Sequence, residues 1–285
     1  MHLLALVSLG LFWGLSPSLY KLMGDQGIPV THIVVFTGVG VGLGLLFAGN
    51  PRARYVSPQI IWYGLGCGAL LNLPFALSLE ISRHVPVTDY ALIVSTFPLF
   101  NYLLSLVIGR EKLAATRVAA MALGFASSAI LILGNRTEGH DHHLTWWTLA
   151  TFVVPFLYTF YNYFCSAYWP RSADARTLGM AESFASAILA VPFLLWFDPP
   201  WSPGLPGPLS YWPLIVAVAI WVIERIAYFT LIRDRGPVFT GQGVFIATPA
   251  SVLYGMIFFR DAGGWLLWLS LALLMIALWL NTKRA

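Results

Sequence analysis

Two ionisable residues, Glu224 and Arg225, lie side by side in an apolar segment long enough to cross a lipid bilayer. Arginine cannot lose its proton to escape burial, so Arg225 must pair with an anion or meet water or a ligand. Each charge at the middle of a spanning helix costs about 2.5–3.5 kcal/mol on insertion scales, so such charges mark functional positions. Two functional interpretations are open: the pair recognises a zwitterion, or Glu224 holds a proton. The third alternative is a structural ion pair between helices.

Aromatic and amide side chains are expected near this pair. Trp221, Glu224 and Tyr228 fall at i, i+3 and i+7 on one helical face. Asn72 aligns with the pair through the internal repeat described below, and it either lines a cavity or bonds a carbonyl freed by Pro74. An aromatic-walled pocket would suit aromatic, apolar or cationic ligands. The predicted substrate-binding residues are Glu224, Arg225, Tyr228, Asn72, Trp13, Gln242, Asp89, Tyr158 and Trp221.

Other acidic and histidine residues lie nearer the ends of the apolar segments. Glu80 and Glu182 are expected to be solvated or to reach the membrane surface, whereas Asp89 is balanced between a binding and a structural role. Residues 140–143 (His-Asp-His-His) have metal-ligand chemistry, but adjacent residues rarely converge on one ion. They predict a solvated linker and no metal site.

The composition is that of an integral membrane protein. Hydrophobic residues make up 58% of the chain and charged residues 10%, whereas a soluble domain carries about 25% charge. The apolar runs are continuous rather than alternating, which predicts helices and not a barrel. Cys67 and Cys165 both fall inside apolar segments, so no disulfide framework is implied. The ten predicted spans are Leu3–Met23, Val30–Gly49, Gln59–Leu79, Val85–Gly109, Ala114–Gly134, Leu144–Tyr168, Thr177–Phe197, Tyr211–Ile232, Val238–Phe259 and Gly264–Leu280.

Several function classes are excluded by missing motifs. The chain has no Walker-type phosphate loop, no His-Glu-x-x-His and no Gly-x-Ser-x-Gly. We therefore expect no cofactor, no ATPase and no recognisable hydrolase. The formal charge of +4 does not indicate nucleic-acid binding, because the basic residues are informative through their positions relative to the membrane, as described below.

The two halves of the chain carry the same signals. Pro86-Val87 is followed by Pro98, and Pro237-Val238 by Pro249, with the same spacing and an offset of about 151 residues. Five crossings per copy would place the copies in opposite orientations, the signature of an inverted-repeat transporter. The fold class predicted is all-α, with ten transmembrane helices as two inverted five-helix repeats. The domains are expected at 1–137 and 144–285, joined by a polar external linker at 138–143.

Basic residues predict the orientation. With both termini in the cytoplasm, eleven of the sixteen Lys and Arg residues fall on the cytoplasmic side and four outside, leaving Arg225 within a helix. Arg110 then lies inside and Arg260 outside, as an inverted repeat requires. We expect a multi-pass protein of the plasma (cell inner) membrane with both termini cytoplasmic.

At this point the chain resembles the EamA branch of the drug/metabolite transporter superfamily. Phe12-Trp13-Gly14 looks like the family's Trp-Gly signal, residues 84–111 resemble its fourth helix, and residues 234–261 resemble a second copy. The matching residues are Pro98, Gly109-Arg110-Glu111, Gly236-Pro237, Pro249 and Arg260-Asp261. Asp261 replaces the more usual glutamate, and Tyr158–Cys165 lacks the Trp-Gly pair that the second copy should carry.

The resemblance implies a central cavity between the halves and transport of a small metabolite by alternating access, with substrate between helices 1, 3, 4, 6, 8 and 9. We favour an amino acid or similar zwitterion as substrate and efflux as direction. A membrane-embedded enzyme on a lipid-like substrate and a non-transporting partner subunit are the alternatives. The expected partners are the substrate and the lipid bilayer, not nucleic acid. Proton coupling stays open, as does the choice between monomer and homodimer.

Overall fold

The computed structural model describes residues 2–48, 57–109, 112–137, 145–170, 173–200, 204–260 and 264–282, which form helices and no strand. In chain order the elements are α1 (His2–Asp25), α2 (Val30–Ala48), α3 (Pro58–Ile81), α4 (Val87–Val94), α5 (Phe97–Val107), α6 (Ala115–Thr137), α7 (Trp146–Ala150), α8 (Val153–Ala167), α9 (Ala175–Phe197), the 3-10 turn η2 (Pro208–Tyr211), α10 (Trp212–Gly241), α11 (Val244–Phe259) and α12 (Trp265–Thr282).

Seven stretches of the described chain are long and apolar enough to cross a membrane, including the combined stretches Val87–Val107 and Phe239–Phe259. Val118–Ile130 and Trp265–Leu280 form shorter apolar helices. Every segment predicted from hydrophobicity corresponds to one helix or to a broken pair of helices. The predicted all-helical, multi-pass membrane class is confirmed, because about 20 apolar residues suffice to span the hydrocarbon core.

Two predicted spans are each broken into two helices just before a proline. Residues 95–96 separate α4 from α5, and Pro98 lies in the first turn of α5. Residues 151–152 separate α7 from α8, and Pro155 lies in the first turn of α8. Proline has no amide hydrogen and clashes with the preceding turn, so a helix start is its least costly position.

A third irregularity lies at the end of α10. Gly236 has φ 79° and ψ 173°, a conformation that residues with a Cβ rarely adopt. The next residue is Pro237, which disfavours the helical conformation at the residue before it. The helical rod therefore kinks here before it leads into α11.

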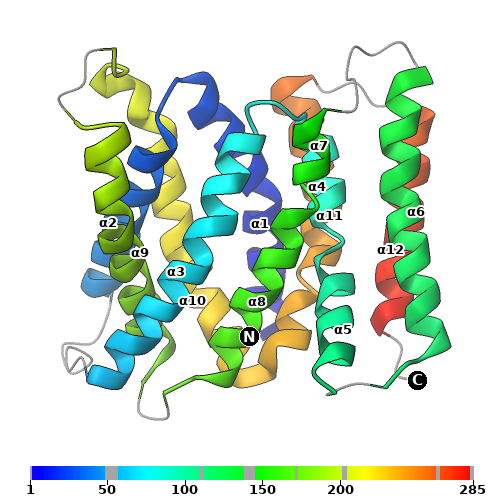
Figure 1. The fold of residues 1–285 in the computed structure, drawn as a ribbon, viewed down its shortest axis with the longest axis horizontal. Coiled ribbons are helices and arrows are strands. Elements are labelled where there is room, and N and C mark those ends of the chain that lie inside the picture. Colours follow the sequence, from blue (N-terminus) through cyan, green and yellow to red (C-terminus); the bar gives the residue numbers. More distant parts are fainter. Residues whose placement is uncertain are drawn as a thin grey trace.

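The helices of the two halves pack against one another closely. α2 and α3 pack on α9, α1 packs on α10 and α11, and α6 pairs with α12 (Figure 1). Small residues permit this approach: a Cβ on Gly38 of α2 would lie 2.7 Å from the Ser183 carbonyl oxygen of α9. Such contacts are typical of helix packing in membranes, where small residues let backbones approach.

The ends of the helices fix the relative directions of the spans. α1 begins and α12 ends at the lower end of the bundle in Figure 1, whereas α5 ends at the lower end and α11 at the upper end. The predicted Arg110-Glu111 signal, the linker at 138–143 with its histidines, and Asp261 lie outside the described residues.

Candidate functional site: a polar cavity inside the helix bundle

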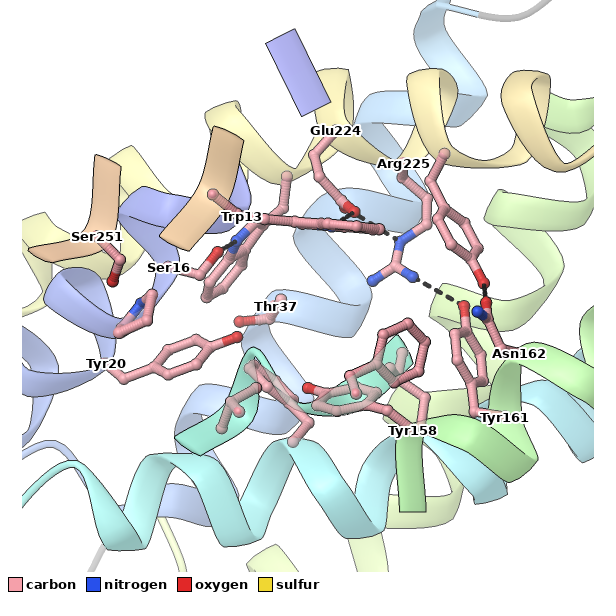
Figure 2. A pocket seen from close by; sticks show the side chains of 18 of the residues that line it. Trp13, Ser16, Tyr20, Thr37, Tyr158, Tyr161, Asn162, Glu224, Arg225 and Ser251 are labelled. Carbon is pink, nitrogen blue, oxygen red and sulfur yellow. Dashed lines mark hydrogen bonds and ion pairs between the residues drawn. The ribbon is translucent and has the colours of Figure 1, made fainter. Parts of the chain in front are cut away.

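A cavity of about 210 Å³ lies inside the bundle, between helices of both halves (Figure 2). Its walls come from α1, α3, α4, α5, α8, α10 and α11. These helices lie in the first, third, fourth, sixth, eighth and ninth predicted spans, which the resemblance implied, and α2 and α9 also contribute. The volume suits a small metabolite rather than a drug-sized molecule, because pockets for the latter run from about 300 to 1,000 Å³.

Nine of the residues that line the cavity are aromatic. The Tyr20 ring lies 5.7 Å from Phe75, 6.5 Å from Tyr90 and 5.9 Å from Trp221, measured between ring centroids. Phe75 and Trp221 meet edge to face at 5.6 Å. Such tilted and edge-to-face contacts are the favoured geometries of aromatic pairs, so these rings form a rigid apolar wall.

A three-residue charge cluster lies at one side of the cavity. The Arg225 Nη1 atom is 3.0 Å from Glu182 Oε1 and 3.1 Å from the Tyr161 hydroxyl oxygen, to which it donates hydrogen bonds. The Arg225 Nε atom is 3.7 Å from Glu224 Oε2. The Glu182 side chain is fully buried and that of Arg225 is 16% exposed. Two carboxyl groups therefore share one guanidinium, and with both ionised the cluster carries one negative charge in excess.

Glu224 is held in place from α1. The Trp13 indole Nε1–H donates a hydrogen bond of 2.9 Å to Glu224 Oε1, and Figure 2 shows Glu224 between Trp13 and Arg225. The Trp13 ring also contacts Tyr228, with centroids 6.2 Å apart. The α1 indole thus orients a carboxylate of α10 and joins the two halves of the molecule.

Further hydrogen bonds fix the polar side chains of the walls. Tyr228 donates to the Asn162 side-chain oxygen, which joins α10 to α8. The Trp221 Nε1–H donates to Ser16 Oγ at 3.2 Å, and Ser16 in turn donates to the Phe12 carbonyl at 3.0 Å. These polar groups are therefore pre-oriented before any ligand arrives.

The structure brings together six of the nine predicted site residues. Those that line the cavity are Glu224, Arg225, Tyr228, Trp13, Tyr158 and Trp221. Asn72 does not line it: its amide nitrogen donates to the Ser186 carbonyl at 2.9 Å and its oxygen accepts from the Ser186 hydroxyl. Gln242 caps the end of α10, and Asp89 is buried in the first turn of α4.

The expectation for Glu182 was wrong. It was placed near a membrane surface because it lies early in its helix, but it is fully buried and pairs with Arg225. Gly179, one turn earlier, makes room for this pair, because a Cβ there would lie 3.0 Å from Arg225 Cγ. Cavity residues that the sequence reasoning did not assign to the site include Thr37, Asn162 and Ser251.

Comparisons with known proteins agree with this architecture. Residues 1–133 match the model of the EamA-like transporter family. A probable terminal-alkyne amino-acid exporter of Streptantibioticus cattleyicolor is 27% identical, over 59% of this chain and 59% of that relative. The match thus spans less than two thirds of the relative's length.

One solved crystal structure is 16% identical and covers 99% of this chain and 96% of its own, with a TM-score of 0.61, a likeness that shows the fold alone. The family and the named relative point to a transporter rather than an enzyme. The resemblance seen in the sequence is confirmed as a similarity: residues 1–133 match the EamA-like transporter family.

Proposed function

We propose that this protein is a secondary transporter that exports an amino acid or a similar zwitterion across the plasma membrane by alternating access. The observation that carries the proposal is a carboxylate and a guanidinium, Glu224 and Arg225, on one side of an aromatic-walled cavity in the middle of the bundle. Such a pair matches the ammonium and the carboxylate of an amino acid. The name of the relative, an amino-acid exporter, supports the substrate class and the direction.

Arg225 has donors left for a substrate carboxylate. Both of its hydrogen bonds within the described residues start from Nη1, and Nε has no hydrogen-bond partner there. Nε is buried and faces Glu224 Oε2 at 3.7 Å, so Nη2 is the donor left for a substrate carboxylate. Figure 2 shows this group extending toward the space below Glu224.

Glu224 supplies the complementary charge. Because Glu182 already neutralises Arg225 at 3.0 Å, the carboxylate of Glu224 is the excess charge of the cluster. A cation or the ammonium of a zwitterion would balance it, whereas a purely anionic substrate would not. A buried ion pair by itself is weak grounds for stability, so we assign the cluster a binding role.

The packing supports the ten-span inverted repeat, with halves at 1–137 and 144–285. In such a repeat α1 corresponds to α8, α2 to α9, α3 to α10, α5 to α11 and α6 to α12. A contact between two helices should then recur between their counterparts in the other half. α1 packs on α10 and α11 as α8 packs on α3 and α5, and α3 packs on α9 as α10 packs on α2. α2 with α9 and α6 with α12 are counterparts that pair directly. This is the pattern expected of two like units related by a two-fold axis.

This arrangement supports alternating access. We propose that α3, α4, α5, α10 and α11 rock against the remaining helices, so that the cavity opens at one membrane surface at a time. The breaks at residues 95–96 and Gly236 lie within the moving set and would let its rods change angle. Both termini are assigned to the cytoplasm from the excess of basic residues on that side.

The test is transport in proteoliposomes that contain the purified protein, with radiolabelled amino acids. Glu224→Gln and Arg225→Leu should each abolish flux at normal expression, because each removes one half of the zwitterion site. Asp234→Asn is the matched control, since Asp234 pairs with Arg233 near the end of α10, away from the cavity residues. Unaltered flux in both site variants would remove the assignment.

A further inference from the structure

Many serine and threonine hydroxyls in the helices bond to a carbonyl about one turn earlier. Ser78 donates to Pro74 at 2.6 Å and Thr159 to Pro155 at 2.9 Å, for example. This is the usual way in which a helix within a membrane satisfies such a group. Buried hydroxyls that do not do so are therefore informative.

Three buried serine and threonine hydroxyls have no hydrogen-bond partner within the described part of the chain: Ser18, Thr37 and Ser251. Thr37 on α2 and Ser251 on α11 line the cavity, and Ser251 is only 2% exposed. Ser18 on α1 is fully buried but does not line the cavity. An unsatisfied buried hydroxyl costs about 1–3 kcal/mol, so two at one cavity call for a ligand that satisfies them.

The positions of the two hydroxyls differ from that of the charge cluster. Figure 2 shows Ser251 on the side of the cavity away from Arg225 and Asn162, with Thr37 between them. The aromatic wall of Tyr20 and Trp221 described above belongs to the same cavity. A molecule held by its charged groups at the cluster would extend its side chain toward the hydroxyls.

We propose that Thr37 and Ser251 form a subsite for a neutral hydrogen-bonding group, a hydroxyl or an amide, on the side chain of the transported amino acid. This rests on the proposed function and adds the substrate class. A hydroxyl both donates and accepts, so it satisfies a neutral polar group. Glu224 and Arg225 are the charged residues among the described lining, so a charged substrate side chain would find no counter-charge at the hydroxyls.

The test compares amino acids that are alike in shape and differ in one polar group: tyrosine with phenylalanine, threonine with valine, and glutamine with methionine. Binding to the purified full-length protein is measured by calorimetry. In at least one pair the polar member should bind at least about tenfold more tightly, because a site built to bond a hydroxyl rejects the analogue that lacks it. Equal binding within all pairs would overturn the subsite and leave the transporter proposal intact.

Variants show which residues make the selection. For the pair of amino acids that wild-type protein distinguishes, Thr37→Val and Ser251→Ala should each bring the ratio of the two affinities toward one. The control Ser18→Ala should keep the wild-type ratio, because the Ser18 hydroxyl lies outside the cavity. A ratio that stays unchanged in both cavity variants would overturn the assignment to these hydroxyls. If no amino acid of any pair binds, the proposed function fails together with the subsite. The comparison within wild-type protein decides the matter even if a variant does not fold.

Discussion

Replacing Glu182 by leucine tests whether the charge cluster holds the bundle together. The change leaves the Arg225 guanidinium without the carboxylate at 3.0 Å, with Glu224 Oε2 at 3.7 Å as its nearest remaining anion. Glu182 does not line the cavity, so the direct effect is on stability and not on contact with a ligand. The substitution thus tests the contribution of the cluster to stability separately from its role in binding a ligand.

The magnitude follows from these distances. At an effective dielectric constant of about 20, opposite charges 3.0 Å apart attract by about 5.5 kcal/mol and those 3.7 Å apart by about 4.5 kcal/mol, before desolvation is counted. Removing one partner of a buried pair costs about 3–5 kcal/mol. Because Glu224 remains close to Arg225, we expect the lower end: a loss of about 3 kcal/mol in the free energy of unfolding.

A double-mutant cycle in detergent is the assay, with unfolding followed by circular dichroism. The losses from Glu182→Leu and Arg225→Leu should together exceed the loss from the double variant by at least about 2 kcal/mol, because the two side chains pair directly at 3.0 Å. The control is Glu80→Gln, since Glu80 is 41% exposed and lies 3.6 Å from Arg83, and it should cost less than about 1 kcal/mol. A Glu182→Leu variant as stable as wild type would refute the reasoning, as would losses of the two single variants that simply add in the double variant.

Three other predictions concern the packing. Cys67 and Cys165 sulfurs lie 3.3 Å apart, so a small oxidant such as iodine should link α3 to α8 and stop transport reversibly, and Cys67→Ser should be insensitive. Gly14→Ala should lower the unfolding free energy by about 1–3 kcal/mol because its Cβ would meet α11 atoms at 2.8 Å, whereas Gly207→Ala, with open space around it, should not. His32→Ala should lower the melting temperature, by loss of bonds of 2.8 and 2.7 Å that tie α2 to the segment before α10; an unchanged melting curve would contradict this.

The positions of the spans could be predicted from the sequence because a membrane helix is a long apolar run. The predicted Val30–Gly49 and Thr177–Phe197 differ from α2 and α9 by one or two residues at an end. The predicted Tyr211–Ile232 ends before the bend, since α10 continues through charged residues to the non-helical Gly236. Charge marks where the apolar run stops, but it does not break a helix, whereas the Gly236-Pro237 pair bends it.

The cavity was predicted only in part. Residues on the same helical face as Glu224, such as Trp221, could be placed because their spacing is a local property of one helix. The burial of Glu182 and the free hydroxyl of Ser251 could not, because they depend on which helices pack together. Asn72 was assigned to the cavity or to a freed carbonyl, and its bonds to Ser186 of α9 depend on the same long-range packing.

The most direct test of the central claim is a comparison of three ligands on the purified protein. For the amino acid that binds most tightly, its affinity is measured beside that of the amine without the carboxylate and that of the acid without the ammonium. Recognition by Arg225 and Glu224 predicts that each truncated compound binds at least about tenfold more weakly, because a charge-assisted hydrogen bond is worth about 1.5–3 kcal/mol. If the amine and the acid both bind as tightly as the amino acid, the cavity does not recognise a zwitterion.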